Sequence, residues 1–217
     1  MTAENSVIIR DISGLQDYTH CWQAMRHFTD QRTDDTLDEI WLLEHSPVFT
    51  QGQNGKAEHI IDPGTIPIVQ SDRGGQVTYH GPGQLVVYAM VNLKRKKWNI
   101  RQLVTALEQP IIQWLADLTI TAEAKCEAPG IYVNNKKIGS VGLRVRRGCS
   151  YHGLALNINM DLQPFLRINP CGFAALAMTQ FADISPLKDI KTAKIQLVDY
   201  LLRNLGYTSP LYNPIIY

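Results

Sequence analysis

Residues 131–158, IYVNNKKIGSVGLRVRRGCSYHGLALNI, carry the pattern that decides the fold of this chain. Asn134-Asn135 separates two apolar segments, and asparagine tolerates the positive φ that a tight turn between antiparallel strands demands. We therefore predict a hairpin made of strands over 131–133 and 137–146, followed by another strand over 150–158.

Shorter patterns on either side of this stretch predict the other elements. Residues 84–93 are rich in valine and predict a long buried strand, which implies a central sheet. Further strands are expected at 6–10, 40–43, 66–70 and 76–80, with an Arg73-Gly74-Gly75 turn between the last two. Apolar residues at helical spacing predict helices over 15–26, 103–115 and 193–205, the second kinked by Pro110 and the third stopped by Gly206.

The order of these elements predicts the fold class. Helices separated by runs of several strands favour an α+β sheet with many antiparallel pairs over a regular alternation of strands and helices. Residues 44–61 are expected to form a long glycine-containing loop, and loops of that length are often functional. No Ser/Gly/Pro-rich linker divides the chain, so we expect one domain over residues 1–217.

Composition and charge exclude several classes of protein. The 217 residues are 45% hydrophobic and 19% charged, which is typical of a globular protein with a sizeable core. The formal net charge of +1 gives no support to nucleic-acid binding. The longest apolar run, 85–91, is far too short to span a membrane, and residues 1–17 lack the pattern of a secretory signal. We therefore expect a cytoplasmic protein that binds neither nucleic acid nor membranes.

The four cysteines are Cys21, Cys126, Cys149 and Cys171. They show neither a CxxC motif nor ligand-like pairing with histidines, which argues against a zinc site and against a disulfide framework. Cys171 lies between a proline and a glycine, so it is expected on a turn, where a nearby cation would lower the thiol pKa from about 8.5 and make it nucleophilic. The alternative is a small buried hydrophobic residue, which suits Cys21 and Cys126, while Cys149 beside two arginines is the rival nucleophile.

Two glycine-containing stretches are candidate ligand-binding walls. Residues 73–84, RGGQVTYHGPGQ, combine four glycines with polar side chains that could surround a ligand held close to the backbone. Gly139 and Gly142 would weaken their strand unless something slender, such as an acyl chain, lies against the backbone. In both stretches the alternative is that the glycines serve only turn or edge-strand geometry.

Basic residues gather in two clusters. Arg144 and Arg146 share one face of their predicted strand and could form a docking patch for an acidic partner. The other run, KRKK at 94–97, is interpreted as solvated surface.

Three motifs together, RGGQVTYHGPGQ at 73–84, KKIGSVGLRVRRGCSYHGLALN at 136–157 and INPCG at 168–172, closely resemble the bacterial lipoyl(octanoyl) transferases, the lipoate-protein ligase B family. The match covers about residues 41–173, in the right order and spacing. The resemblance implies the catalytic-domain fold shared by biotin and lipoate protein ligases, a mixed, largely antiparallel sheet flanked by helices.

The resemblance also assigns roles to residues. Cys171 matches the family's nucleophile, and Lys137 matches the lysine that works with it, whereas Lys136 would point to the opposite face of a strand. His80 and His152 would orient groups in the pocket, and backbone N–H groups near Cys171 or in a His152-Gly153 turn would hold the oxyanion. The acyl pocket of the family matches Arg73, Gly74, Gly75, Gln76, Val77, Thr78, Tyr79, His80, Ser140, Val141, Gly142, Gly153, Leu154 and Ala155.

The implied activity is an acyl transfer. An octanoyl group would pass from octanoyl-acyl carrier protein to a specific lysine of lipoyl domains, those of 2-oxoacid dehydrogenase complexes and of the glycine cleavage H protein, as the first step of protein lipoylation. Cysteine suits a covalent route because its thioester remains reactive, whereas serine would form a more stable ester. No metal, ATP or other cofactor is expected. The alternatives are an ATP-dependent lipoate ligase on the same fold, a hydrolase pairing Cys171 with His80 or His152, and a non-catalytic binder.

Overall fold

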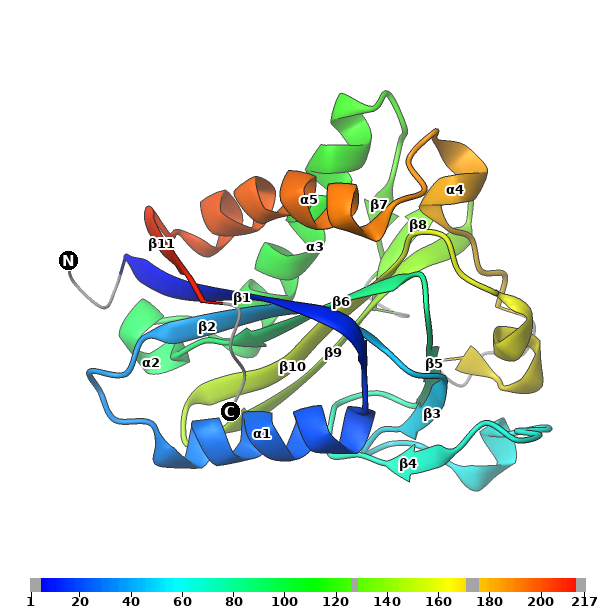
Figure 1. Cartoon of the computed structure of the whole chain (residues 1–217), viewed down its shortest axis with the longest axis horizontal. Helices are drawn as coiled ribbons and strands as arrows, with labels where there is room; N and C mark the ends of the chain where they lie inside the picture. The colour runs from blue at the N-terminus through cyan, green and yellow to red at the C-terminus, as the bar shows by residue number, and fades with distance from the viewer. Residues whose placement is uncertain (1–4, 126–128, 171–175, 214–217) are drawn as a thin grey trace.

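The computed structural model describes residues 5–125, 129–170 and 176–213. Within them, helices cover the two faces of a twisted sheet, and a smaller sheet lies beside it (Figure 1). Helix α1 (Tyr18–Gln31) packs on one face, and α3 (Ile100–Asp117) and α5 (Ile190–Leu205) pack on the other. None of the helices in these ranges has the length and apolar character needed to cross a membrane.

The larger sheet has the strand order β11-β1-β2-β6-β10-β9-β8-β7. β1 pairs in parallel with both of its neighbours, and every other neighbouring pair is antiparallel, so the sheet is mixed and largely antiparallel as predicted. The strands are, in chain order, β1 Ser6–Gln16, β2 Asp38–His45, β6 Gln84–Met90, β7 Glu123–Ala124, β8 Ile131–Val133, β9 Lys136–Arg146, β10 Cys149–Asn157 and β11 Ser209–Tyr212.

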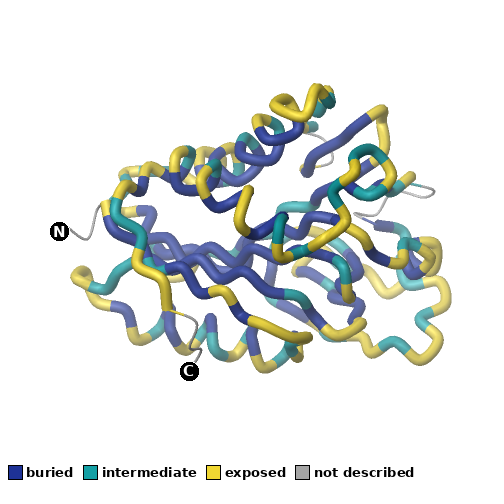
Figure 2. The backbone as a smooth tube through the Cα atoms, turned by 45° about the horizontal axis from the view of Figure 1, so that its top comes forward, coloured by how far each residue is buried: buried dark blue, intermediate teal, exposed yellow. Residues whose placement is uncertain are grey.

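The core lies on both faces of the central strands. These strands consist of buried residues, drawn in dark blue in Figure 2. β6 is buried along its whole length. Alternate side chains of a strand point to opposite faces of the sheet, and helices cover both faces here. Leu85, Val87 and Ala89 join the cluster beneath α3 and α5, whereas Val86 and Tyr88 join the cluster beneath α1. The buried central strand is confirmed, but it ends at Met90. Asn92 then caps a short helix, α2 (Leu93–Lys96), by accepting a hydrogen bond from the Arg95 N–H.

Cap residues set the helix boundaries. Asp17 accepts the His20 N–H at 2.7 Å, so α1 begins at Tyr18, and the prediction that this helix includes Leu15 was wrong. α3 begins with a capping box formed by Asn99 and Gln102 and continues through Pro110. Gly206, with a φ of +72°, ends α5 in the left-handed conformation, as predicted.

A second sheet has the order β4-β3-β5, where β3 is Val48–Gln51, β4 is Ile68–Gln70 and β5 is Val77–His80. The predicted loop over 44–61 therefore contains a strand, and also a 3-10 turn at Ala57–His59. β3 forms there because Val48 and Phe49 are apolar and are covered, Phe49 by the ring of Tyr79. The two strands predicted around residues 73–75 both pair with β3 and not with each other.

The hairpin between β8 and β9 confirms the pattern that decided the fold. Asn134 and Asn135 have φ angles of +49° and +62°, as a tight turn between antiparallel strands requires. Two further short elements follow β10: a 3-10 helix at Gln163–Arg167 and α4 at Phe181–Ile184. The turn Gln163–Arg167 packs its Pro164 and Phe165 inward and leads toward the INPCG motif.

Candidate functional site

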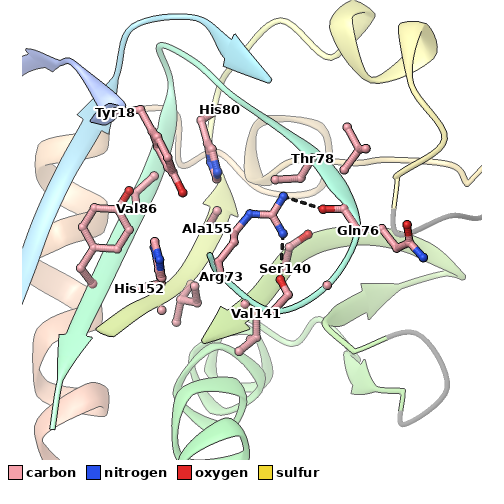
Figure 3. Close-up of a pocket in the computed structure, with 17 residues that line it drawn as sticks. Tyr18, Arg73, Gln76, Thr78, His80, Val86, Ser140, Val141, His152 and Ala155 are labelled. Carbon is pink, nitrogen blue, oxygen red and sulfur yellow. Dashed lines mark hydrogen bonds between the residues drawn. The ribbon is translucent and has the colours of Figure 1, made fainter. Parts of the chain in front are cut away.

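A pocket opens between the large sheet and the loop that precedes β5. It is lined by residues of β6, β9 and β10, by residues 73–78 and by the first residue of α1 (Figure 3). Its empty volume, which includes its open mouth, is about 520 Å³. The structure therefore brings the glycine-rich loop and the two β-hairpin strands, far apart in sequence, to one cavity.

All the predicted acyl-pocket residues except Tyr79 line this cavity. In β5, Thr78 and His80 face the pocket, whereas Tyr79 packs against Phe49 and Phe165, with ring centroids 5.5 Å apart in each case. Tyr79 therefore supports the segment that leads to residue 170 and does not line the cavity.

Three further lining residues, Tyr18, Val86 and Tyr88, were not predicted. Tyr88 lies opposite Gly153 because β6 pairs with β10, and this pairing could not be read from the two strands separately. Tyr18 comes from the first turn of α1, and nothing in its local sequence distinguishes it from a core residue.

Arg73 fixes the shape of the glycine-rich loop. Its guanidinium is buried and donates to the Thr50 hydroxyl at 2.9 Å and to the Thr50 carbonyl at 2.6 Å. It also donates to the Gly74 and Gln76 carbonyls at 2.9 and 2.7 Å (Figure 3). Because these acceptors belong to β3 and to the loop itself, one side chain ties the loop to the small sheet.

Gly142 lets this loop approach β9. The Gly74 N–H donates to the Leu143 carbonyl at 2.9 Å, and a Cβ on Gly142 would lie 3.1 Å from the Gly74 carbonyl oxygen. At Gly142, the backbone of the glycine-rich loop therefore lies against β9. Gly139 does not line the pocket, and the nearest atoms to it are those of Ile131 and Ala155.

Two histidines and two tyrosines form the inner wall, and a third buried histidine, His45, contacts them. Tyr18 stacks on His80 and His152 with ring centroids 5.7 and 6.5 Å apart, and the Tyr88 hydroxyl lies 2.6 Å from His45 Nε2. Burial lowers the pKa of His45 to about 4, lowers that of His80 well below its usual value, and lowers that of His152. At neutral pH the three imidazoles are uncharged, which suits a pocket for a neutral ligand.

His152 is positioned by Asp72. Its Nε2 lies 2.9 Å from the Asp72 carboxylate, which also accepts the hydroxyl of Tyr151 at 2.5 Å and the indole N–H of Trp22 at 2.7 Å. Burial alone would raise the pKa of Asp72, but these hydrogen bonds lower it to about 2. His152 lies inside β10 and not in the expected turn, with a φ of +60°, and its Nδ1 has no hydrogen-bond partner among the described residues.

Lys137 is completely buried, whereas Lys136 beside it is exposed, in keeping with their expected opposite orientations. The Lys137 ammonium donates to the Pro129 carbonyl at 2.7 Å. Its backbone N–H donates to the Ala177 carbonyl at 2.8 Å, and its carbonyl accepts the Thr179 N–H at 2.9 Å. Residues 177–179 thus pair with Lys137, and Ala177 is six positions after Cys171 (177 − 171 = 6).

A register shift in the hairpin accompanies the burial of Lys137. Tyr132 pairs with Lys137 but Ile131 pairs with Gly139, so Ile138 is an extra residue on β9. A bulge of this kind changes the direction in which side chains leave a strand. β9 lines the pocket through Ser140 and Gly142. Lys137 lies on the same strand but on the other side of the bulge, so it does not follow the regular alternation of side chains to which these two residues belong.

Cys171 lies outside the described residues, as does Cys126. The segment before it is held by backbone contacts to residues 59–62, which include the Asn169 N–H to the His59 carbonyl at 2.8 Å and a bridge between Ile168 and Ile60. Cys149, the rival nucleophile, is buried; desolvation raises its pKa in spite of the positive charges of Arg32 and Arg95, so this thiol is not activated.

The surface arginines of β9 and the following turn contact polar neighbours. Arg146 pairs with Asp30 at 2.7 Å, Arg147 donates to the Asp30 carbonyl at 2.9 Å, and Arg144 donates to the Gln53 side chain at 2.7 Å. The ion pair with Asp30 reduces the net charge of the predicted docking patch. Over the ranges that the structure describes, no three His, Cys, Asp or Glu side chains are grouped as a metal ion would require.

Solved structures with the same fold include ligases of lipoate and biotin. The putative lipoate protein ligase Ta0514 from T. acidophilum with bound lipoic acid superposes with a TM-score of 0.77 at 13% identity, over 96% of this chain and 88% of that one. The biotin protein ligase from Aquifex aeolicus superposes with a TM-score of 0.51 at 13% identity, over 94% and 70% of the two chains. At these identities the likeness shows the fold alone, and it confirms the predicted biotin/lipoate protein ligase fold.

Sequence relatives are much closer. The profile of the lipoyl protein ligase A/B catalytic domain matches residues 17–202. An octanoyltransferase of Colwellia psychrerythraea is 59% identical over 93% of this chain and 85% of the relative, and one of Klebsiella pneumoniae subsp. pneumoniae is 56% identical over 97% and 98%. This chain therefore belongs to the lipoyl protein ligase A/B catalytic-domain family and, within it, to the octanoyltransferases, which are acyltransferases.

Proposed function

We propose that this chain transfers an octanoyl group from octanoyl-acyl carrier protein to a lysine of a lipoyl domain, through a thioester on Cys171. The acceptors would be the lipoyl domains of 2-oxoacid dehydrogenase complexes and the glycine cleavage H protein. The observation that carries the proposal is the placement of Lys137. This buried lysine lies on β9, one of the strands that line the pocket. Its backbone is hydrogen-bonded to residues 177 and 179, which follow Cys171.

Two steps share one proton carrier in this mechanism. The Cys171 thiolate, stabilised by the Lys137 ammonium, attacks the thioester carbonyl, and the carrier thiolate leaves with a proton from Lys137. Neutral Lys137 then takes a proton from the incoming lysine amine as that nitrogen attacks the acyl-enzyme. The amide forms, and the Cys171 thiolate and the Lys137 ammonium are regenerated.

The pocket supports a neutral acyl chain. Its two histidines, His80 and His152, are uncharged at neutral pH, and apolar surface comes from Val86, Leu154 and Ala155. Arg73, which is the buried cation of the lining, has its donors directed at backbone and hydroxyl oxygens of β3 and of the loop. We assign it to holding the loop and not to binding a charged substrate.

A second candidate function is hydrolysis of the acyl thioester. The pair of His152 and Asp72 favours it, because a carboxylate that orients an imidazole is also part of cysteine and serine hydrolase sites. Water would then accept the acyl group in place of a lysine. Free octanoate formed without a lipoyl domain, at the rate of normal turnover, would identify this reaction.

The experiment that tests the proposal is an intact mass spectrum of the protein after incubation with octanoyl-acyl carrier protein alone. We expect one octanoyl increment on the peptide that contains Cys171, removable by hydroxylamine and transferred when a lipoyl domain is added. No adduct, or an adduct on Cys149, would contradict the mechanism. Product formed from free octanoate and ATP would instead indicate the ligase reaction of the ATP-dependent relatives.

A further inference from the structure

One peptide unit connects a buried acid to Lys137. The carbonyl of Pro129 accepts from the Lys137 ammonium at 2.7 Å, and the N–H of Gly130 donates to the Glu108 carboxylate at 3.1 Å. These two groups belong to the same peptide bond. A carboxylate on its N–H side polarises the peptide and strengthens the carbonyl as an acceptor for the ammonium.

Gly130 allows this close arrangement. Its φ is +143°, and a Cβ at this position would lie 2.5 Å from Lys137 Cε and 2.4 Å from the Gly139 carbonyl oxygen. Only a residue without a side chain fits between Lys137 and the backbone of β9. The peptide at 129–130 is therefore built against Lys137.

The fold does not require a charged side chain at position 108. Glu108 is only 7% exposed, and burial raises its pKa, while the Gly130 N–H and the positive charge of Lys137 act in the opposite direction. A raised pKa means that ionised Glu108 destabilises the fold at neutral pH, because the unfolded chain ionises more easily. A glutamine would accept the same hydrogen bond without this cost.

We propose that Glu108 is a positioning residue for acyl transfer, which holds Lys137 through the 129–130 peptide and whose charge sets the pH range of the reaction. The inference rests on the proposed function of Lys137. Other titratable groups on this side of Lys137 are Tyr132, whose ring centroid is 5.6 Å from the ammonium, and Lys125, which lies over the same ring at 4.8 Å and pairs with Glu123 at 3.2 Å.

The test compares Glu108→Gln with the wild type in single-turnover acylation of Cys171 by octanoyl-acyl carrier protein, measured by intact mass from pH 5 to 10. The amide keeps the acceptor oxygen but removes the charge. A nearby carboxylate favours the ammonium and disfavours the thiolate, so its loss moves both titrations to lower pH. We expect the profile to shift down by about one pH unit, with circular dichroism and melting temperature unchanged or slightly improved.

Two further variants separate charge from position. Asp117→Asn removes one negative charge from the same helix about 14 Å further along its axis, and it should leave the pH profile in place. Glu108→Ala removes the acceptor as well as the charge, so its profile should shift like that of Glu108→Gln, and acylation should be roughly tenfold slower than in Glu108→Gln at every pH because Lys137 loses its support.

The outcomes distinguish the two proposals. A wild-type protein that forms no adduct contradicts the covalent mechanism itself. A wild-type protein that is acylated while Glu108→Gln keeps both its rate and its pH profile overturns the role of Glu108.

If the variants do not fold, NMR of the wild type with 15N-labelled lysine serves instead. The Lys137 resonance, assigned by its loss in Lys137→Arg, should move as Glu108 titrates, and a resonance insensitive to that titration overturns the inference.

Discussion

At the scale of single residues, the first question is which sulfur carries the acyl group. Cys171→Ser replaces the thiol with a hydroxyl of similar size that lacks thiolate character at neutral pH. We expect acyl-enzyme formation and transfer to be abolished or severely slowed while the circular dichroism spectrum is unchanged. Cys149→Ser is the matched control and should transfer normally, because Cys149 is buried with a raised pKa. Ordinary turnover by Cys171→Ser would rule out the thioester route.

The adjacent lysines of β9 give a second test at this scale. Lys137→Arg keeps a positive charge, but a guanidinium does not release its proton in this pH range. Because positioned proton transfer contributes about 10²–10⁴-fold, we expect transfer to slow by at least about a hundredfold in a steady-state assay. Lys136→Arg, one position away and exposed, should be close to the wild type. Normal activity in Lys137→Arg would leave Lys137 with an electrostatic role alone.

At the scale of elements, a chain of buried amides connects the pocket to the segment beyond Cys171. His80 Nδ1 lies 2.7 Å from Gln84 Oε1, Gln84 donates to Asn157 Oδ1 at 3.0 Å, and Asn157 donates to the Thr179 carbonyl at 3.0 Å. Thr179 in turn donates its N–H to the carbonyl of Lys137. The end of β10 is thereby fixed to the residues that pair with Lys137.

Removal of this connection should weaken both stability and catalysis. Asn157→Ala leaves the Thr179 carbonyl without this donor, so we expect a loss of about 1–3 kcal/mol in the free energy of unfolding, measured by urea denaturation. The rate of acylation should fall as well, because residues 177–179 are held less firmly. Asn159→Ala, two positions away at an exposed site, is the control. Equal stability of the two variants would show that the amide chain is unimportant.

The elements also show which parts of the fold can be predicted from sequence patterns. The hairpin of β8 and β9, the buried β6, and α3 and α5 were predicted because each has a long apolar period or a distinctive turn. β7 and β11 have only two and four residues, too few for a period, and they exist through pairing with distant strands. Leu15 was assigned to a helix because it continues the spacing of Tyr18 and Trp22, but the Asp17 cap ends that continuity.

The same limit applies to the site. The pocket residues on the glycine-rich loop, β9 and β10 were predicted from motifs of the family, and all but Tyr79 line the cavity. Tyr18, Val86 and Tyr88 were missed because their membership depends on the order of strands in the sheet and on where α1 packs. The amide contacts of Gln84 and Asn157 depend on the same long-range pairing.

At the scale of the whole molecule, the buried histidines make stability depend on pH. Each has a folded-state pKa below its usual value, so the unfolded chain binds more protons and stability falls as the pH drops below about 6.5. For His45, with a pKa of about 4, the loss reaches about 3 kcal/mol by pH 4. Melting curves from pH 7 to 4 should show this decline.

A matched pair of variants isolates the contribution of His45. His45→Gln removes the titrating group, and its melting temperature should fall less steeply with acid than that of the wild type. His20→Gln changes an exposed histidine of α1 and should follow the wild-type curve. Identical acid dependence in both variants would show that another group, such as His80 or His152, causes the decline.

The order of the large sheet also bears on how the chain is made. β1 is flanked by β2 on one side and by β11 on the other, and the registers pair Ser6 with Ser209 and Ile9 with Tyr212. A chain emerging from the ribosome therefore presents β1 with one unsatisfied edge until residues 209–212 have been synthesised. Nascent chains are exposed to wrong strand pairing during that interval, and a premature stop after Gly206 would make the open edge permanent.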